Sequence, residues 1–156
     1  SEVIVDAVIT KSEAEREEVW NIRENFELLL AGQAIYLYDV SLPIKNMTAY
    51  VSDLRRRLKE CWPEHACYVF GHIADGNLHL FIRPADERAS HTDVNREVYG
   101  ALKPYQGSVS AEHGIGVEKK PWLAHSRTEQ ELHLMRTLKK TMDPKNILNP
   151  GRIIDI

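Results

Sequence analysis

The stretch that decides the fold is Gly71-His72-Ile73-Ala74-Asp75-Gly76-Asn77-Leu78-His79. It joins two strand-like runs, residues 66–73 and 77–83, and Asp-Gly between such runs is a strong signal for a β-hairpin. Residues just before and just after a hairpin turn lie side by side, so His72 and His79 can converge on one transition metal such as zinc. The alternative is a hairpin whose histidines are merely exposed, because two ligands do not make a metal site.

A second polar stretch, Ser108 to Gly116, has the sequence Ser-Val-Ser-Ala-Glu-His-Gly-Ile-Gly. A core has no need of the adjacent acid and imidazole, Glu112 and His113, and the glycines permit close approach of a ligand. Glu112 would complete a His-His-Glu set with an open position for substrate, and His113 would stand beside the metal as a base. Asp75 or Asn77 would fix the turn or orient a ligand. The alternative for this stretch is a solvent-exposed polar loop.

The rest of the chain alternates strand-like and helix-like segments. We expect strands over residues 3–9 and 34–40, and helices from Ser12 to a stop at Gly32, from Pro43 to Pro63, over 92–103 and from Thr128 to Met142. This order predicts an α+β fold, a ferredoxin-like sandwich in which an antiparallel sheet carries helices packed on one face. We see no repeat or linker, so the sequence predicts one domain over residues 1–156.

Local signals mark the ends and faces of these helices. Two capping boxes, Ser12 with Glu15 and Thr128 with Glu131, predict helix starts. Asp39 and Ser41, at the end of the second strand, are expected to cap the helix that follows. A buried stripe on the first helix is expected from its spaced apolar residues, Val19, Ile22, Phe26 and Leu29.

Composition excludes several classes of protein. The 156 residues are 43% hydrophobic and carry a net charge of -3, which suits a globular protein and argues against nucleic acid as a partner. The single basic cluster, residues 55–57, fans out around a helix and is expected to be solvated. We expect no signal peptide, and no apolar run is long enough to span a bilayer. With only two cysteines, we expect a cytoplasmic protein, with peripheral membrane association as a second option.

Four ordered motifs resemble those of the C-terminal domain of FAD-linked oxidases, the family of D-lactate dehydrogenases, the glycolate oxidase D subunit and D-2-hydroxyglutarate dehydrogenase. Residues 71–79 resemble the signature Gly-His-x-Gly-Asp-Gly-Asn-x-His, and residues 110–116 resemble Ser-x-Glu-His-Gly-x-Gly. Residues 143–152 resemble the closing Asp-Pro-x-x-x-Leu-Asn-Pro-Gly-Lys, and residues 38–43 match a further segment. The resemblance covers almost the entire chain.

This resemblance implies a site for a D-2-hydroxy acid. A divalent ion, usually zinc, would be bound by the counterparts of the family's ligands, His72, His79 and Glu112. His113 would bind substrate and remove its hydroxyl proton as the catalytic base, and hydride would pass from the α-carbon to FAD. Arg23 would pair with the substrate carboxylate through its bidentate fork. Asn149, in the closing motif, is assigned to cofactor binding.

Three positions depart from the family pattern. Ala74 replaces a glycine, which is tolerable if that position has ordinary backbone angles. Leu37 stands where members acting on 2-hydroxyglutarate place a lysine, and Phe81 replaces a polar side chain. Losing that lysine weakens the case for a second carboxylate on the substrate. The substitutions therefore predict a smaller or more apolar, lactate- or glycolate-like, 2-hydroxy acid.

The family binds FAD chiefly through an N-terminal domain, and nothing in this chain resembles that domain. Gly114-Ile115-Gly116 is only part of a dinucleotide-binding fingerprint. We therefore expect an excised domain or one subunit of a split enzyme, inactive by itself. Its expected partners are the 2-hydroxy acid, an FAD-binding domain in the same chain or a separate subunit, and an electron acceptor. The competing hypotheses are a stand-alone metal-dependent hydrolase that uses the His-His-Glu site, and an interaction module with a vestigial site.

Overall fold

The computed structural model describes residues 4–25 and 35–156 of the chain. The chain divides into two compact units, Ser1–Ala34 and Ile35–Ile156, where the sequence predicts one domain. No helix among the described residues is long and apolar enough to cross a membrane.

The first unit contains helix α1, Glu13–Glu24. Its N-cap is as predicted, because the Ser12 hydroxyl accepts the N–H of Glu15 at 3.2 Å. The reciprocal bond of the predicted capping box differs, since the Glu15 carboxylate accepts the N–H of Lys11 at 2.7 Å. The predicted strand over residues 3–9 is wrong for its described part, since residues 4–9 pair with no other strand and their β-branched side chains are exposed. The predicted buried stripe is also wrong as far as it is described: no residue of α1 is buried. Phe26, Leu29 and Gly32 lie outside the described residues.

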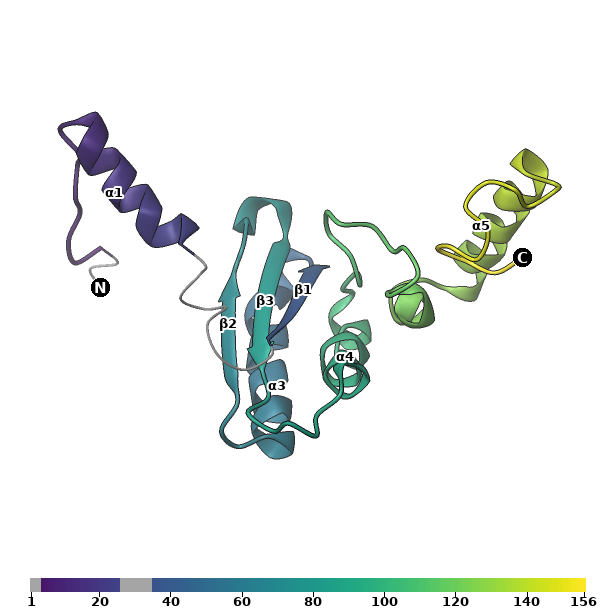
Figure 1. Cartoon of the computed structure of the whole chain (residues 1–156), viewed down its shortest axis with the longest axis horizontal. Coiled ribbons are helices and arrows are strands. Elements are labelled where there is room, and N and C mark those ends of the chain that lie inside the picture. The colour runs from purple at the N-terminus through teal and green to yellow at the C-terminus, as the bar shows by residue number, and fades with distance from the viewer. Residues whose placement is uncertain (1–3, 26–34) are drawn as a thin grey trace. The chain divides into compact units, whose positions relative to one another are not determined.

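The second unit is built on a three-stranded antiparallel sheet, β1 (Tyr36–Ser41), β2 (Ala66–Phe70) and β3 (Asn77–Arg83), in the order β1-β3-β2 (Figure 1). The predicted hairpin is confirmed: β2 and β3 pair directly, and a short 3-10 turn, Ile73–Asp75, lies between them. β1 pairs with the other edge of β3, so the central strand is the last of the three in sequence.

Three helices follow or interrupt the strands in this unit: α3 (Ile44–Cys61), α4 (His91–Gly100) and α5 (Glu129–Met142). The predicted capping box of Thr128 with Glu131 is confirmed at the start of α5. A second box, Ser90 with Asp93, begins α4 one residue before the helix predicted over 92–103. Two further 3-10 turns, Lys103–Tyr105 and Lys120–His125, connect these helices.

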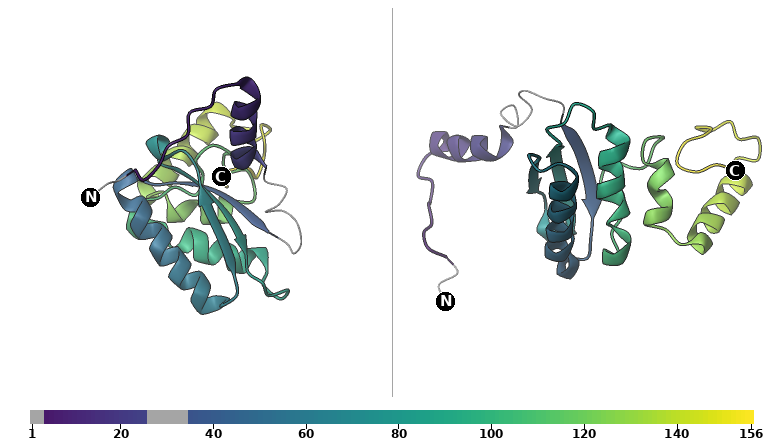
Figure 2. Two further views of the ribbon diagram at one scale, coloured as in Figure 1. Left: turned by 90° about the vertical axis from the view of Figure 1, so that its left-hand side faces the viewer. Right: turned by 90° about the horizontal axis from the view of Figure 1, so that it is seen from below.

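One face of the sheet forms the core. Alternate residues of β3, Leu78, Leu80 and Ile82, are buried, as period-2 strand geometry requires. They belong to one apolar cluster with buried residues of α3 and α4, and α3 lies behind the sheet in Figure 1. Each fully buried apolar side chain contributes roughly 1.5–3 kcal/mol. The α+β prediction, an antiparallel sheet with helices on one face, is thus confirmed, and Figure 2 shows the same elements from two further sides.

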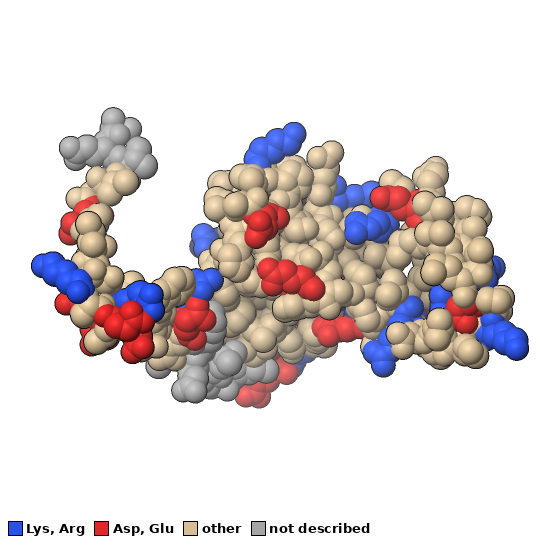
Figure 3. Space-filling view, turned by 90° about the horizontal axis from the view of Figure 1, so that it is seen from above, with Lys and Arg blue, Asp and Glu red and all other residues tan. Residues whose placement is uncertain are grey.

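The other face of the sheet has no such helical cover among the described residues of the second unit. The intervening residues of β3, His79, Phe81 and Arg83, are only partly buried there. Figure 3 views the molecule from above relative to Figure 1 and not onto this sheet face; on the surface that it draws, acidic and basic side chains are interspersed among uncharged ones. The candidate site lies on the face of the sheet that carries His79.

Candidate metal centre

The hairpin turn brings His72 and His79 together. Gly76 closes the turn with a left-handed backbone, φ 68°, and the N–H of Asn77 donates to the carbonyl of His72 at 3.2 Å. A side chain at Gly76 would meet the backbone oxygen of Leu42 at 2.4 Å, so glycine fits here for close approach as well as for φ. The two imidazole rings lie 6.3 Å apart, centre to centre.

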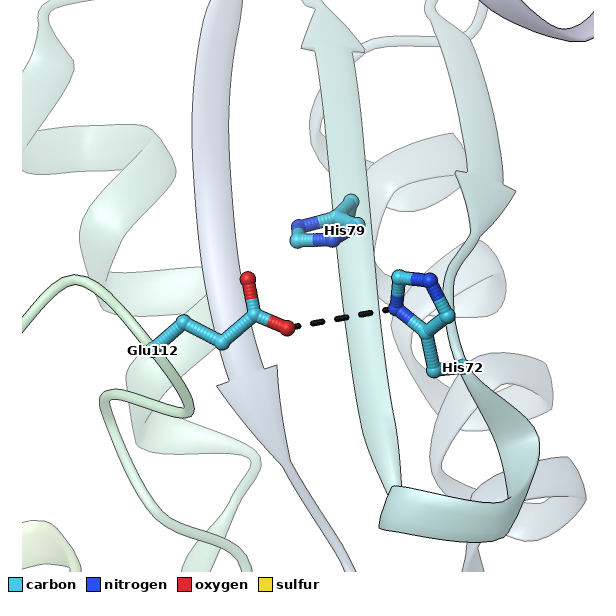
Figure 4. Close-up of side chains that lie close together, drawn as sticks. All are labelled: His72, His79 and Glu112. Carbon is cyan, nitrogen blue, oxygen red and sulfur yellow. Dashed lines mark ion pairs between the residues drawn. The ribbon is translucent and has the colours of Figure 1, made fainter.

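The loop that carries Glu112 and His113 is attached to the sheet at the end of β1. Ser41 and Ser108 exchange two backbone hydrogen bonds, of 2.8 and 3.2 Å, and form an isolated antiparallel bridge. This bridge returns the chain to the sheet after α4. The Glu112 side chain then reaches across β1 toward the hairpin, from the left of Figure 4.

Ligand atoms of His72, His79 and Glu112 all lie within 4.8 Å of one another. His72 Nδ1 and Glu112 Oε1 are 3.9 Å apart, as the dashed line in Figure 4 marks. Ligand atoms that each lie about 2.0–2.2 Å from an ion are at most about 4.4 Å apart, so small side-chain movements would suit this set to one cation. Two imidazoles and a carboxylate are donors that zinc accepts, and a three-residue set leaves a position for substrate. The residues present therefore fit the predicted ion.

Asn77 ties the two arms together. Its side-chain amide donates to Glu112 Oε1, and the residue itself is buried at the start of β3. The prediction that Asp75 or Asn77 orients a ligand thus has support at Asn77. The side chains of His72 and Glu112 are about half exposed, at 50% and 52%, whereas that of His79 is 18% exposed. A small molecule can therefore reach this centre from solvent in the second unit as described.

His113 lies beside the three predicted ligands. Its ring stacks on that of His79 with centres 6.2 Å apart and an interplanar angle of 24°. Its Nδ1 lies 3.9 Å from Asp39 Oδ2, and the side chain is 66% exposed. The neighbourhood is the one that the predicted base requires, while its catalytic role stays a prediction.

The residue that holds this loop, Asp39, was not predicted from the sequence. It was expected to cap the next helix, and that expectation is wrong: α3 has no side-chain cap, and its N-cap residue is Pro43. Asp39 is instead 1% exposed, and its Oδ2 accepts the backbone N–H groups of three successive residues, Ala111, Glu112 and His113, at 3.0, 2.8 and 2.9 Å. The available signal was an acid between Tyr38 and Val40, both of which had to be in the core.

Lys119 completes the anchor of the loop. Its ammonium lies 3.6 Å from Asp39 Oδ2 and donates to Ser110 Oγ at 3.1 Å. Burial raises the pKa of Asp39, but the N–H groups of His113, Glu112 and Ala111 and the Lys119 charge reverse this, so the pKa of Asp39 is lowered overall. Burial lowers the pKa of Lys119, and Asp39 opposes that shift.

Two predicted site residues belong to other elements of the chain. Arg23 is on α1 in the first unit, where it pairs with Glu24 and lies 5.2 Å above the centre of the Trp20 ring. Asn149 is exposed in the loop after α5, with φ 46°, and its carbonyl accepts the N–H of Arg152 at 3.2 Å. Their roles in substrate and cofactor binding stay predictions.

The departures from the family pattern fall next to the centre. Leu37 and Phe81 are cross-strand partners, one row along the sheet from the pair Asp39 and His79, and Tyr68 flanks Phe81 on β2. Leu37 and Tyr68 are 53% and 39% exposed, so this apolar row is open. Ala74 lies in the 3-10 turn without a positive φ, which confirms that alanine is tolerated there.

Comparison with known proteins gives the family. The profile of "FAD linked oxidases, C-terminal domain" matches residues 1–153. A D-2-hydroxyglutarate dehydrogenase of Xanthomonas citri pv. viticola is 37% identical over 97% of this chain and 34% of its own length. A Schizosaccharomyces pombe protein provisionally named a mitochondrial D-lactate dehydrogenase is 38% identical over 98% of this chain and 31% of its own length. A mitochondrial D-2-hydroxyglutarate dehydrogenase of Bos taurus is 37% identical over 99% of this chain and 28% of its own length.

The chain belongs to the family of FAD-linked oxidase C-terminal domains, and the resemblance found in its motifs is confirmed. It spans about a third of the length of the curated relatives that it matches. Some relatives are named as mitochondrial, so the predicted cytoplasmic location stays a prediction.

Proposed function

We propose that this chain is the substrate- and metal-binding part of a flavin-dependent dehydrogenase that oxidises a D-2-hydroxy acid to the 2-oxo acid. The observation that carries the proposal is the convergence of His72, His79 and Glu112 within 4.8 Å on the open face of the sheet. The names of the relatives, dehydrogenases of D-2-hydroxyglutarate and D-lactate, support the class of substrate.

The three ligands would hold a divalent ion, which we expect to be zinc. Such an ion lowers the pKa of a bound hydroxyl group, so that a neutral imidazole can take its proton near neutral pH. His113 is the residue to do so, because it lies beside His79 and is exposed to an incoming molecule. Arg23 would bind the carboxylate of the substrate, and Asn149 would contact the cofactor. FAD, bound chiefly by another domain or subunit, supplies the hydride acceptor, which an electron acceptor later reoxidises.

The apolar row Leu37, Phe81 and Tyr68 would lie beside the substituent on the α-carbon of the substrate, which is a methyl group in lactate and a hydrogen in glycolate. A second carboxylate there would lose water without gaining a cationic partner from these three residues, and unpaired burial of charge is costly. We therefore propose a lactate- or glycolate-like substrate, although several relatives are named for 2-hydroxyglutarate. A panel of D-2-hydroxy acids on the full-length protein tests this: kcat/KM should be highest for D-lactate or glycolate, and a preference for D-2-hydroxyglutarate would contradict it.

The class of reaction is tested by metal content and flavin together. Full-length protein should contain one divalent ion per chain and reduce its flavin when a D-2-hydroxy acid is added, with the bleaching of flavin absorbance as the measure. Chelation should slow the bleaching, and zinc should restore it. Hydrolytic activity without any bleaching by the substrate panel would instead favour the metal-dependent hydrolase.

A further inference from the structure

Beyond the three predicted ligands, one buried carboxylate touches both arms of the candidate metal centre. We infer that Asp39 is the positioning residue of the centre: its Oδ2 holds the loop that presents Glu112, and its Oδ1 orients the ring of His79. This inference rests on the proposed function, because it assigns a role toward the ion that His72, His79 and Glu112 would bind.

Hydrogen bonds support the role of Asp39 Oδ2 in holding the loop. Three successive backbone N–H groups, of residues 111–113, converge on this single oxygen at 2.8–3.0 Å, and Ser110 Oγ lies 3.4 Å away. Residues 108–116 form no helix, and in the part of the chain that the structure describes Ser108 alone of them makes a bridge to a strand. The Asp39 carboxylate therefore fixes the backbone of this loop, whereas backbone hydrogen bonds between strands fix that of the hairpin.

The Oδ1 half of the inference rests on an unsatisfied acceptor. Asp39 Oδ1 is buried and has no hydrogen-bond partner among the described residues, and such an acceptor is costly to leave unpaired. Asp39 and His79 are direct partners across β1 and β3, and Oδ1 lies 3.9 Å from His79 Nδ1. A shift of about 1 Å would make this contact a hydrogen bond. Metal-binding histidines commonly donate their second ring N–H to a carboxylate, which fixes the tautomer and leaves the other nitrogen for the metal.

Burial makes this arrangement rigid. The Asp39 side chain is 1% exposed, and the ammonium of Lys119, itself 11% exposed, balances its charge from 3.6 Å. Lys119 also donates to the main-chain oxygen of Asp39 at 3.3 Å, so it braces the strand as well as the carboxylate. Both oxygens of Asp39 are thereby fixed relative to the sheet, and the two arms of the centre share one reference point.

The test compares matched substitutions in the full-length protein. Asp39→Asn keeps the shape but loses the charge and one acceptor. Asp143→Asn is the control, because Asp143 is also a buried carboxylate that accepts two backbone N–H groups, of Ile147 and Leu148, and pairs with a lysine. Zinc affinity is measured on metal-stripped protein by competition with a chelator. The cobalt(II) form gives the ligand geometry through its visible absorption spectrum.

We expect Asp39→Asn to weaken zinc binding about 10- to 100-fold and to change the cobalt spectrum, while Asp143→Asn leaves both as in the unsubstituted protein. Asp39→Glu keeps the charge beside Lys119 but moves both oxygens, so it should fail in the same way; it carries the test if Asp39→Asn does not fold. Unchanged affinity and spectrum in a folded Asp39 variant would overturn the inference alone. Rescue by Asp39→Glu would reduce the role of Asp39 to its charge and would also overturn it. Failure of the unsubstituted protein to bind zinc would overturn the metal site itself.

Discussion

The two arms of the candidate metal centre reach it by different means. His72 and His79 are set by a β-hairpin, in which backbone hydrogen bonds between neighbouring strands and a tight turn fix the spacing. Glu112 and His113 come from a loop whose amides are gathered by one distant carboxylate, Asp39. Local backbone structure thus positions one arm, and a contact between residues more than seventy positions apart positions the other.

The largest effect is expected where either arm loses its ligand. His79→Ala and Glu112→Ala should each abolish stoichiometric zinc in the full-length protein, because two remaining donors do not make a zinc site. Elemental analysis of purified protein measures the loss. His133→Ala removes an exposed histidine of α5 and should leave the zinc content unchanged. Full zinc occupancy in His79→Ala would show that the hairpin arm is not part of the site.

Substitution of one glycine in each arm should show that the hairpin tolerates a change less well than the loop does. Gly76 and Gly114 both have positive φ, 68° and 75°, so alanine is strained by about 1–2 kcal/mol at either position. At Gly76 the new Cβ would also meet the backbone oxygen of Leu42 at 2.4 Å, whereas at Gly114 no atom of the described residues lies within 4 Å of it. The total cost at Gly76 should therefore be on the order of 3 kcal/mol.

Thermal unfolding of the full-length protein is the measurement. Gly76→Ala should lower the midpoint clearly further than Gly114→Ala does. Equal midpoints for the two variants would mean that the hairpin turn tolerates alanine as well as the loop does. This result would contradict the proposed difference between the two arms.

Asn77 joins the arms, and its removal should have a smaller effect than loss of a ligand. Asn77→Ala deletes the amide that donates to Glu112, so zinc affinity should fall by about 10-fold, at the lower end for an outer partner. Asn46→Ala is a matched control, since its amide also donates one bond, at 2.8 Å, but to the carbonyl of Tyr105 and not to a predicted ligand. Competition with a chelator should detect the difference, and equal affinity in the two variants would contradict it.

The smallest effect is expected from acid. The pKa of Asp39 is lowered in the folded protein, so its contribution to stability is complete above the ordinary Asp value of 3.8 and is lost as pH falls below it. The protection of amides 111–113 of the metal-free protein, measured against their intrinsic exchange rates, should then fall before the protection of the β2–β3 ladder. Asp39→Asn should abolish this pH dependence. Simultaneous release of loop and ladder would contradict the prediction.

The same contrast explains what the sequence could and could not predict. The hairpin that brings His72 and His79 together is encoded in nine consecutive residues, and helix starts such as Ser12 and Thr128 have local caps. Glu112 was predicted as a third ligand from its chemistry and from family resemblance, not from any local geometry. The role of Asp39 was missed because hydrogen bonds to the amides of residues 111–113 leave no pattern near position 39.

The strand predicted over residues 3–9 failed for a related reason. β-Branched residues favour an extended chain, but a strand forms only when another strand accepts its hydrogen bonds. The described part, residues 4–9, has no such partner and exposes Ile4, Val5 and Val8. Propensity is a property of the segment, whereas pairing is a property of the whole sheet.

The alternation of β3 couples the core to the metal centre. Leu78 points into the apolar cluster, and His79, the next residue, points to the ligands on the opposite face. A slip of one residue between β3 and its neighbours would exchange them, moving leucine to the ion and imidazole into the core. The packing of Leu78, Leu80 and Ile82 therefore also fixes the strand register that places His79 among the predicted ligands. An insertion within β3 should therefore impair both metal binding and folding. A change of length in the turn after Arg83 should leave the register of β3 intact.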